Sequence, residues 1–283
     1  MKAFLSRQPK LLLGGLLLLA PFVLMAIAPS LFVSHGPAEI IDVPLLPPST
    51  SHPFGTDEIG RDVLTRVVYG ARVDIVISLS AAAIAFAVGT LFGLLTGFLG
   101  GFADSLGMRS VDVLLSFPTI VLALFLITVF GRGELVQILA IAMVMAPSMA
   151  RFSRGTGLVL RNRGYVEASR ISGGGIGHIL RRHLLPNALP TLLVAASVLA
   201  SSAVLIAASL SYLGVGTQPP TPSWGNMLRS AYDVVYYAPF YGLFPGIFVT
   251  LVAGAYVMIG EGLRRRIASG RALAAGNSPV VRV

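Results

Sequence analysis

The sequence predicts an all-α membrane protein with six transmembrane helices, and three observations support this prediction. Of the 283 residues, 55% are hydrophobic and only 12% are charged, which excludes an ordinary soluble domain. Six apolar runs follow one another along the chain. The Lys and Arg residues gather between alternate runs, as expected where positive charge fixes topology.

The first apolar run, 11–33, carries no charge and follows a basic segment with Lys2, Arg7 and Lys10. It predicts a membrane anchor. The alternative is a cleaved signal peptide, because residues 26–28 read Ala-Ile-Ala. The run is longer than a signal peptide needs, and Pro29 follows the candidate site, so the anchor is favoured.

Residues 34–74 form a polar stretch whose first half is rich in proline. In its second half, Thr56 or Asp57 is expected to cap an amphipathic helix lying on the membrane face. Glu58 and Asp62 fall in the first turn, where acids complement the helix dipole, so no metal site is expected. The predicted apolar stripe of this helix is Val63, Leu64, Val67, Val68 and Ala71.

The second span is expected at 75–103. Its glycines Gly89, Gly93 and Gly97 are spaced by four, which favours close helix packing, although a lipid-facing position is the alternative. Residues 104–112 are expected to form a polar turn. The third and fourth spans are expected at 113–130, with Pro118 kinking or starting the helix, and at 135–150, with ends that extend past the flanking charges.

The segment 151–190 is polar, basic and rich in glycine, unlike the apolar runs on either side. A short helix is expected at 165–172, ended by the glycines 173–175. A second helix should follow and stop at Pro186. Its expected apolar face is Ile176, Ile179, Leu180, His183 and Leu184, with His178, Arg181 and Arg182 on the other face. Such a basic, partly apolar knob suits docking into a groove of a partner.

Spans five and six are expected at 189–215 and 240–259, followed by the arginines 264–266. Between them, residues 218–227 cannot be regular helix throughout, because they contain three prolines. This segment carries Trp224, and four tyrosines lie nearby: Tyr232, Tyr236, Tyr237 and Tyr241. The cluster predicts either anchoring at the membrane interface or a short re-entrant element near a pore mouth.

The positive residues predict the orientation. With the amino terminus inside, 16 of the 21 Lys and Arg residues fall in cytoplasmic segments. The five outside are Arg61, Arg66, Arg72, Arg132 and Arg229. This bias places both termini and the segment 151–190 in the cytoplasm. It also explains the net charge of +9 without a nucleic-acid partner.

Several chemistries are excluded or disfavoured. The chain has no cysteine, and its only lysines are Lys2 and Lys10, so no phosphate-binding loop of the G-x-x-x-x-G-K-[ST] type can lie downstream. His178 and His183 are five residues apart, which does not match a helical zinc pair, and no catalytic constellation can be assembled. The predicted spans hold no ionisable residue in their interiors, which indicates a pathway without its own energy source. No cofactor or metal is expected in this chain.

Residues 167–187 resemble the EAA loop of binding-protein-dependent ABC importer permeases. Glu167, Ala168, Gly173, Leu185 and Pro186 match the pattern EAA, three residues, Gly, nine residues, I-x-LP. Ser169 and His183 depart from it. The string 183–187, HLLPN, is similar to the peptide and nickel branch of the family, as are GTDE followed by GRD at 55–62 and PPTPSWGNML at 219–228.

This resemblance implies a type I importer permease fold, with 75–263 as the transmembrane domain, 1–74 as anchor and extracytoplasmic loop, and 264–283 as a basic tail. It implies a paralogous second permease, two ATPase subunits that bind ATP and Mg, and a solute-binding protein, in the lipid of a bacterial cytoplasmic (inner) membrane. Trp224 and Asn226 are expected at the extracytoplasmic mouth. The residues expected to couple to the ATPases are Glu167, Ala168, Ser169, Gly173, His183, Leu185, Pro186 and Asn187.

The function expected from the resemblance is peptide import by a non-catalytic permease. Nickel or metallophore import by the same architecture is one alternative. A self-powered secondary carrier is another, which transport without an ATPase partner would reveal. A membrane-embedded enzyme would need activity from the single chain, and a DNA-binding helix-turn-helix is disfavoured because 151–190 is tethered between spans.

Overall fold

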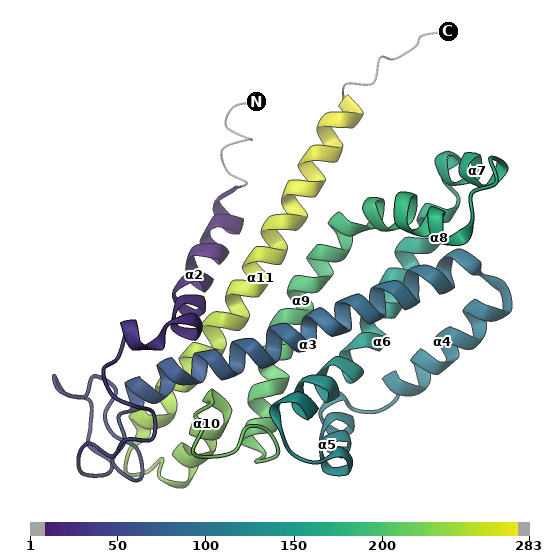
Figure 1. Ribbon diagram of the computed structural model, residues 1–283. Helices are drawn as coiled ribbons and strands as arrows, with labels where there is room; N and C mark the ends of the chain where they lie inside the picture. The colour runs from purple at the N-terminus through teal and green to yellow at the C-terminus, as the bar shows by residue number, and fades with distance from the viewer. Residues whose placement is uncertain (1–8, 277–283) are drawn as a thin grey trace.

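Long helices form a bundle in the computed structural model, and one of them crosses the others diagonally (Figure 1). The structure describes the backbone of residues 9–276 and the side chains of 10–269. The long helices are α2 (Pro9–Ile27), α3 (Val63–Leu99), α6 (Glu134–Arg161), α9 (Leu185–Tyr212) and α11 (Pro239–Gly276). The shorter ones are η1 (Pro29–Leu31), α4 (Gly101–Leu115), α5 (Thr119–Phe130), α7 (Gly164–Ile171), α8 (Ile176–Ile179), the π-turn η2 (Leu180–Leu184) and α10 (Trp224–Asp233).

Among the described residues, five helices are long and apolar enough to cross a membrane, and the pair α4 and α5 makes a sixth span if the pair is counted as one. The two helices of the pair meet at an angle of 88°. Pro118 lies at this break and precedes the first residue of α5. Since proline disfavours the α conformation in the residue before it, the helix cannot continue straight through. The prediction of six spans is therefore confirmed, with the third span bent.

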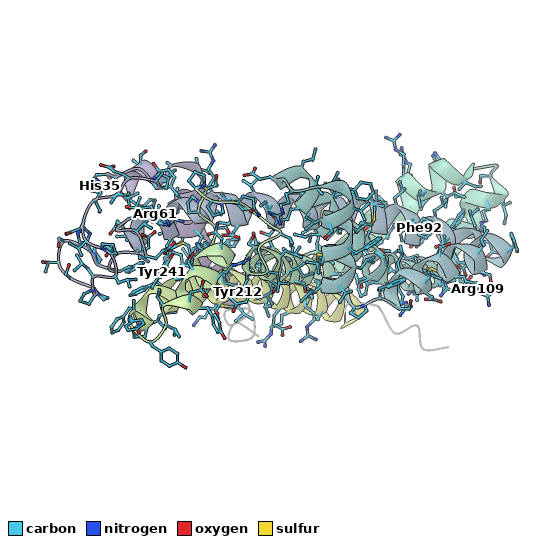
Figure 2. All side chains as sticks on the ribbon, turned by 90° about the horizontal axis from the view of Figure 1, so that it is seen from below. His35, Arg61, Phe92, Arg109, Tyr212 and Tyr241 are labelled. Carbon is cyan, nitrogen blue, oxygen red and sulfur yellow. The ribbon has the colours of Figure 1, made fainter. Side chains whose placement is uncertain are left out.

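The two ends of the bundle differ. In Figure 1, α7 and α8 lie at the same end as the start of α2 and the end of α11, and we call this the α7 end. The loop before α3, together with α10, forms the opposite end, which we call the α10 end. Seen from below in Figure 2, His35 and Arg61 lie toward one end of the long axis and Arg109 lies toward the other.

The amphipathic helix predicted on the membrane face is not a separate element. A single helix, α3, begins at Val63 and continues to Leu99, so it passes without interruption through the predicted boundary between 74 and 75. Its cap is Asp62, whose carboxylate accepts from the Thr65 amide at 2.7 Å, and not Thr56 or Asp57. Val63 and Val67 are fully buried in the protein core, because α2 and α10 pack on this face.

The polar turn predicted at 104–112 is instead part of α4, which lies along α6. Arg154 of α6 donates two hydrogen bonds to the Asp104 carboxylate, at 2.6 and 2.7 Å. Arg151 forms a second ion pair with Asp112. The paired residues are 50 and 39 positions apart in the sequence, and the bidentate Arg154–Asp104 contact fixes orientation as well as charge.

Helix α11 also extends beyond its predicted end and carries the arginines 264–266 within it. Glu261 pairs with Arg264 and Arg265 on the same helix, both at 2.7 Å. The predicted tail 264–283 therefore begins inside a helix, and its last seven residues, 277–283, lie outside the described residues, as do Lys2 and Arg7. Helix α2 packs closely on α11, since a Cβ at Gly262 would lie 2.6 Å from the Leu12 amide nitrogen.

Trp224 joins the α10 end to the core. Its side chain is fully buried, and its indole N–H donates to the Val67 carbonyl at 3.0 Å. Its backbone N–H donates to the Asp74 carboxylate at 2.7 Å. The prediction that Trp224 anchors the chain at the membrane interface is therefore wrong, as it is for the buried Tyr241. Of the predicted cluster, Tyr232, Tyr236 and Tyr237 are exposed.

Asp74 lies one residue before the predicted start of the second span, outside the interior that was expected to hold no ionisable residue. It lies within α3 and is almost completely buried. Its carboxylate accepts a hydrogen bond from the backbone N–H of Trp224, the first residue of α10. The helix dipole favours a negative charge at this position. The sequence pattern missed this role because the partner is 150 residues away.

Helices α3 and α6 pack with their backbones in close contact. A Cβ at Gly89 would lie 2.6 Å from the Ala146 carbonyl oxygen, and one at Gly97 would lie 2.7 Å from that of Arg154. At Gly93, midway between them, a Cβ would overlap the Ala150 carbonyl oxygen. The glycine spacing of four thus lies against the backbone of α6, where only hydrogen atoms fit.

We expect Gly93→Ala to destabilise the protein by about 1 to 3 kcal/mol, because the added methyl group forces α3 away from α6. Gly155→Ala is the matched control, since a Cβ there meets nothing within 4 Å. In a helix interior this control should be neutral or stabilise by up to about 1 kcal/mol. Thermal unfolding of the purified chain in detergent measures both, and equal midpoints would contradict the packing role of Gly93.

Candidate functional site

The segment between α6 and α9 projects from the α7 end as a helical knob (Figure 1). Helix α7 spans Gly164–Ile171 and α8 begins at Ile176, in agreement with the predicted helix, turn and helix. The glycines between the two helices allow the chain to make the connecting turn. Gly173 has φ +80°, a backbone conformation that side-chain-bearing residues rarely adopt.

Two hydrogen bonds close the turn. The Gly173 amide donates to the Arg170 carbonyl at 3.0 Å, and the Gly174 amide donates to the Ser169 carbonyl at 2.8 Å. This pair of bonds is a Schellman motif, which satisfies the last carbonyls of α7. A Cβ at Gly174 would lie 2.7 Å from Ser169 Oγ, so the chain passes close to that side chain.

A small apolar cluster ties the knob to the bundle. It consists of Val166 from α7, Ile179 from α8, Leu184 from η2 and Phe98 from the end of α3, all nearly or completely buried. The Arg170 guanidinium lies 4.6 Å from the centre of the Phe98 ring, a cation–π contact. We call Val166, Ile179, Leu184 and Phe98 the knob clamp.

Ile179 and Leu184 were predicted on the apolar face of the second helix, and both are buried. Ile176, predicted on the same face, is half exposed.

Pro186 does not end the second helix, contrary to prediction. The chain forms one turn of π-helix at Leu180–Leu184, in which the Leu185 amide donates to the Leu180 carbonyl, and then continues as α9. A proline inside an α-helix would clash with the carbonyl four residues earlier. A π-turn widens the helix just before Pro186, so α8, η2 and α9 stay connected.

The residues that match the EAA pattern lie on the surface of the knob. Glu167, Ala168, Gly173, Leu185 and Pro186 are exposed. Two apolar side chains on the knob are also exposed, Ile171 to 82% and Ile176 to 50%.

Ser169 and His183, the two residues that depart from the EAA pattern, are less exposed than the residues that match it. Both are half-buried. The His183 ring lies between those of Tyr165 and His178, with centroids 6.0 and 5.8 Å away. Asn187, which is exposed, donates its amide to the His183 carbonyl at 2.6 Å.

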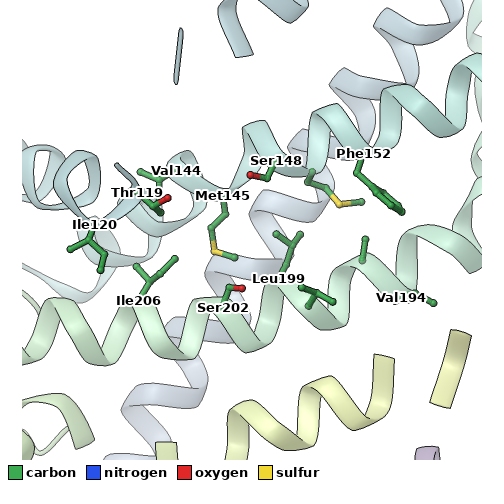
Figure 3. A pocket seen from close by; sticks show the side chains of 13 residues that line it. Thr119, Ile120, Val144, Met145, Ser148, Phe152, Val194, Leu199, Ser202 and Ile206 are labelled. Carbon is green, nitrogen blue, oxygen red and sulfur yellow. The ribbon is translucent and has the colours of Figure 1, made fainter. Parts of the chain in front are cut away.

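A groove of about 640 Å³ opens between α5, α6 and α9 (Figure 3). Met145 and Phe152 of α6 point toward α9, which contributes Leu199 and Ser202. The lining is mostly apolar, and its hydroxyl groups come from Thr119, Ser148 and Ser202. Mostly apolar walls with a few polar groups are typical of sites for small organic molecules. The sequence pattern did not find this groove, because its walls come from three separate helices.

The predicted residues Trp224 and Asn226 have structural contacts at the α10 end. Asn226 forms a capping box with Ser223: the Asn226 amide donates to Ser223 Oγ at 3.2 Å, and the Ser223 amide donates to Asn226 Oδ1 at 3.0 Å. Asn226 also lines a polar cavity that is described further below. Trp224 belongs to the core. Within residues 10–269, no three His, Asp or Glu side chains gather in a way that would hold a metal ion.

Comparison with known proteins gives one family model, described as binding-protein-dependent transport system inner membrane component, which matches residues 89–269. A probable D,D-dipeptide transport system permease protein of Escherichia coli strain K12 is 38% identical over 92% of this chain and 87% of its own length. A dipeptide transport system permease protein of Alkalihalophilus pseudofirmus is 38% identical over 91% of this chain and 85% of its own length.

A glutathione transport system permease protein of Pectobacterium atrosepticum is 37% identical over 77% of this chain and 72% of its own length. Among solved structures, a chain of the inward-facing MetNI methionine ABC transporter is similar, with a TM-score of 0.56 and 23% identity. The match covers 70% of this chain and 96% of that one. It shows that the two chains share a fold.

We expect Gly173→Ala to loosen the end of α7 by about 1 kcal/mol, because alanine is strained at φ +80°. Hydrogen exchange of the amides at 172–174 should become roughly fivefold faster. Gly177→Ala is the matched control, since a Cβ at Gly177 meets nothing within 4 Å. Unchanged exchange in Gly173→Ala would mean that the Schellman turn does not stabilise the knob.

Proposed function

Because this chain belongs to the family of binding-protein-dependent transport system inner membrane components, we propose that it is the permease subunit of a peptide importer. In this role it forms a translocation path with a second, paralogous permease. Two ATPase subunits drive the transport cycle, and a solute-binding protein delivers the peptide. The names of the relatives, which refer to dipeptides and glutathione, support peptides as the substrate class.

We place the α7 end in the cytoplasm of a bacterial cell and the α10 end outside. The distribution of Lys and Arg supports this orientation, since 16 of 21 fall in segments that it makes cytoplasmic. In the fold, the start of α2, the end of α11 and the knob lie at one end, as this topology requires. The ATPases would then meet the knob. This chain has no lysine after Lys10 and so no phosphate-binding loop of its own.

The observation that carries the proposal is the attachment of the exposed helix α7 to the long helices. Its outer surface offers Glu167 for an ion pair and the apolar side chain of Ile171, and α8 adds the exposed Ile176 beside it. A helix with such a surface fits a groove on a partner. We infer that α7 docks in a cleft of the ATPase, where Glu167 pairs with a basic residue.

The knob clamp explains how movement of α7 would reach the membrane. Val166 packs on Phe98 at the end of α3, while α8 continues through the π-turn into α9. A displacement of α7 therefore moves α3 and α9 together. Since α3 is locked to α6 by glycine contacts, the result is a rigid-body rotation, which alternates access between the two sides.

The groove between α5, α6 and α9 is our candidate wall of the translocation path. Its apolar lining and scattered hydroxyls suit peptides of varied sequence, because no charged side chain lines it. The second permease would close over it.

Two alternative functions can be tested against this one. Nickel import rests on the likeness of HLLPN at 183–187 to the peptide and nickel branch. A secondary carrier would need a titrating group, and Asp74 is a buried carboxylate, but it accepts the Trp224 amide at the start of α10. Uptake into vesicles with and without ATP, using a labelled tripeptide and nickel separately, distinguishes the three functions.

We expect Glu167→Lys and Gly173→Asp to leave the amount of permease in the membrane unchanged and to abolish peptide uptake, because each alters the surface of α7. Glu134→Lys is the matched control, since Glu134 is exposed on α6 far from the knob. Uptake of a labelled tripeptide by cells measures the effect. Normal uptake by both knob variants would rule out coupling through α7.

We expect Ser202→Trp to block transport by filling the groove, while the binding-protein interaction stays intact. Leu205→Trp is the matched control, because Leu205 is exposed on the same helix and does not line the groove. The measurement is the maximal uptake rate in vesicles. Equal rates for the two variants would show that the path lies elsewhere.

A further inference from the structure

A second cavity, of about 480 Å³, lies at the α10 end and differs in character from the groove. It is enclosed by the loop before α3, the turn between α5 and α6, the segment after α9, and α10 itself. Charged side chains line it. They are the arginines Arg61, Arg66, Arg132 and Arg229 and the carboxylates Glu58 and Asp233.

Two of these arginines already have protein partners. Arg61 Nε donates to Asp57 Oδ2 at 2.6 Å, and Arg66 Nε lies 3.3 Å from the same oxygen. Arg61 Nη2 also donates to Glu58 Oε1 at 3.3 Å. The Asp57 side chain is fully buried behind them. Arg61 and Arg66 are buried too, so they form a fixed wall of the cavity.

Arg132 and Arg229 differ from these two because they have no protein partner. Both are exposed, and neither makes a hydrogen bond or an ion pair with any residue that the structure describes. Arg229 is nevertheless positioned by the fold. Its guanidinium packs on Gly214, which has φ +80° and where a Cβ would overlap it.

A neutral polar group also lines the cavity. Thr217 is 6% exposed, and its Oγ1 is a buried atom without a hydrogen-bond partner. A buried hydroxyl of this kind costs free energy unless something binds to it. The side-chain amide of Asn226, in contrast, accepts a hydrogen bond from the Ser223 N–H and donates one to the Thr221 carbonyl.

We propose that this cavity is an entry site that binds the C-terminal carboxylate of a peptide through Arg132 and Arg229, with Thr217 as a further donor. Guanidinium groups match the two oxygens of a carboxylate, and bonds of this type are the strong ones. Glu58 is paired with Arg61, so Asp233 is the carboxylate of the lining that can face the charged amino end of a zwitterionic peptide. This inference rests on the proposed function and specifies its substrate class as peptides with a free carboxyl end.

The test measures peptide binding to the complete importer in nanodiscs without the binding protein, by saturation-transfer NMR. Trialanine and its C-terminal amide are the two probes. We expect the amide to bind about tenfold more weakly than the acid, because it loses a charge-assisted pair. Arg132→Gln and Arg229→Gln should each bring acid binding down toward that of the amide.

Arg72→Gln is the matched control, because Arg72 is exposed on α3 and does not line the cavity. It should keep the preference for the acid. Equal binding of acid and amide to the wild-type importer would overturn the inference, as would no binding of either or an unchanged preference in both cavity variants.

ATPase stimulation by the binding protein and trialanine uptake show which part of the proposal has failed. If the cavity variants reduce ATPase stimulation by the binding protein but keep the preference for the acid, the arginines contact that protein and the inference is wrong. Trialanine uptake by the wild-type importer tests the proposed function itself. Uptake without acid-selective binding would leave the proposed function standing and remove the entry site alone.

Discussion

The contact between the backbones of α3 and α6 is the constraint on which the rest of the structure depends. Gly89, Gly93 and Gly97 remove the side chains that would separate the two helices. Lipid offers no hydrophobic force to hold helices together, so close backbone packing carries much of the association. Helix α4 then lies on α6 through the Asp104–Arg154 pair.

The knob is attached both to this rigid pair, through α3, and to α9. The Schellman turn at Gly173 fixes the end of α7, and the knob clamp brings Val166 onto Phe98 of α3. The π-turn before Pro186 keeps α8 continuous with α9. A force on α7 therefore reaches α3 through the knob clamp and α9 through the π-turn, which is the physical basis of the proposed coupling.

The α10 end is stabilised by buried hydrogen bonds and ion pairs. Trp224 and Asp74 fasten α10 to α3 with two buried hydrogen bonds, and Asp57 holds Arg61 and Arg66. A buried carboxylate is tolerated only where its oxygens have partners, and a backbone N–H at a helix start supplies one. The polar cavity and the apolar groove thus divide the proposed tasks, because carboxylate binding needs charge and passage of varied peptides needs its absence.

The amino-acid sequence by itself determined the spans, the glycine turn, α7 and the matching surface residues of the knob, because apolar runs, Gly and Pro act locally. Only the tertiary structure decided which face of Val63–Leu99 is buried, that 104–112 is helical and that Trp224 is core. Each of these depends on a partner far along the chain, such as Arg154 for Asp104 or Trp224 for Asp74. Pro186 shows the same limit, since a widened turn before it allows the helix to continue. Periodicity reports which residues are apolar, but the packing of distant helices decides what covers them.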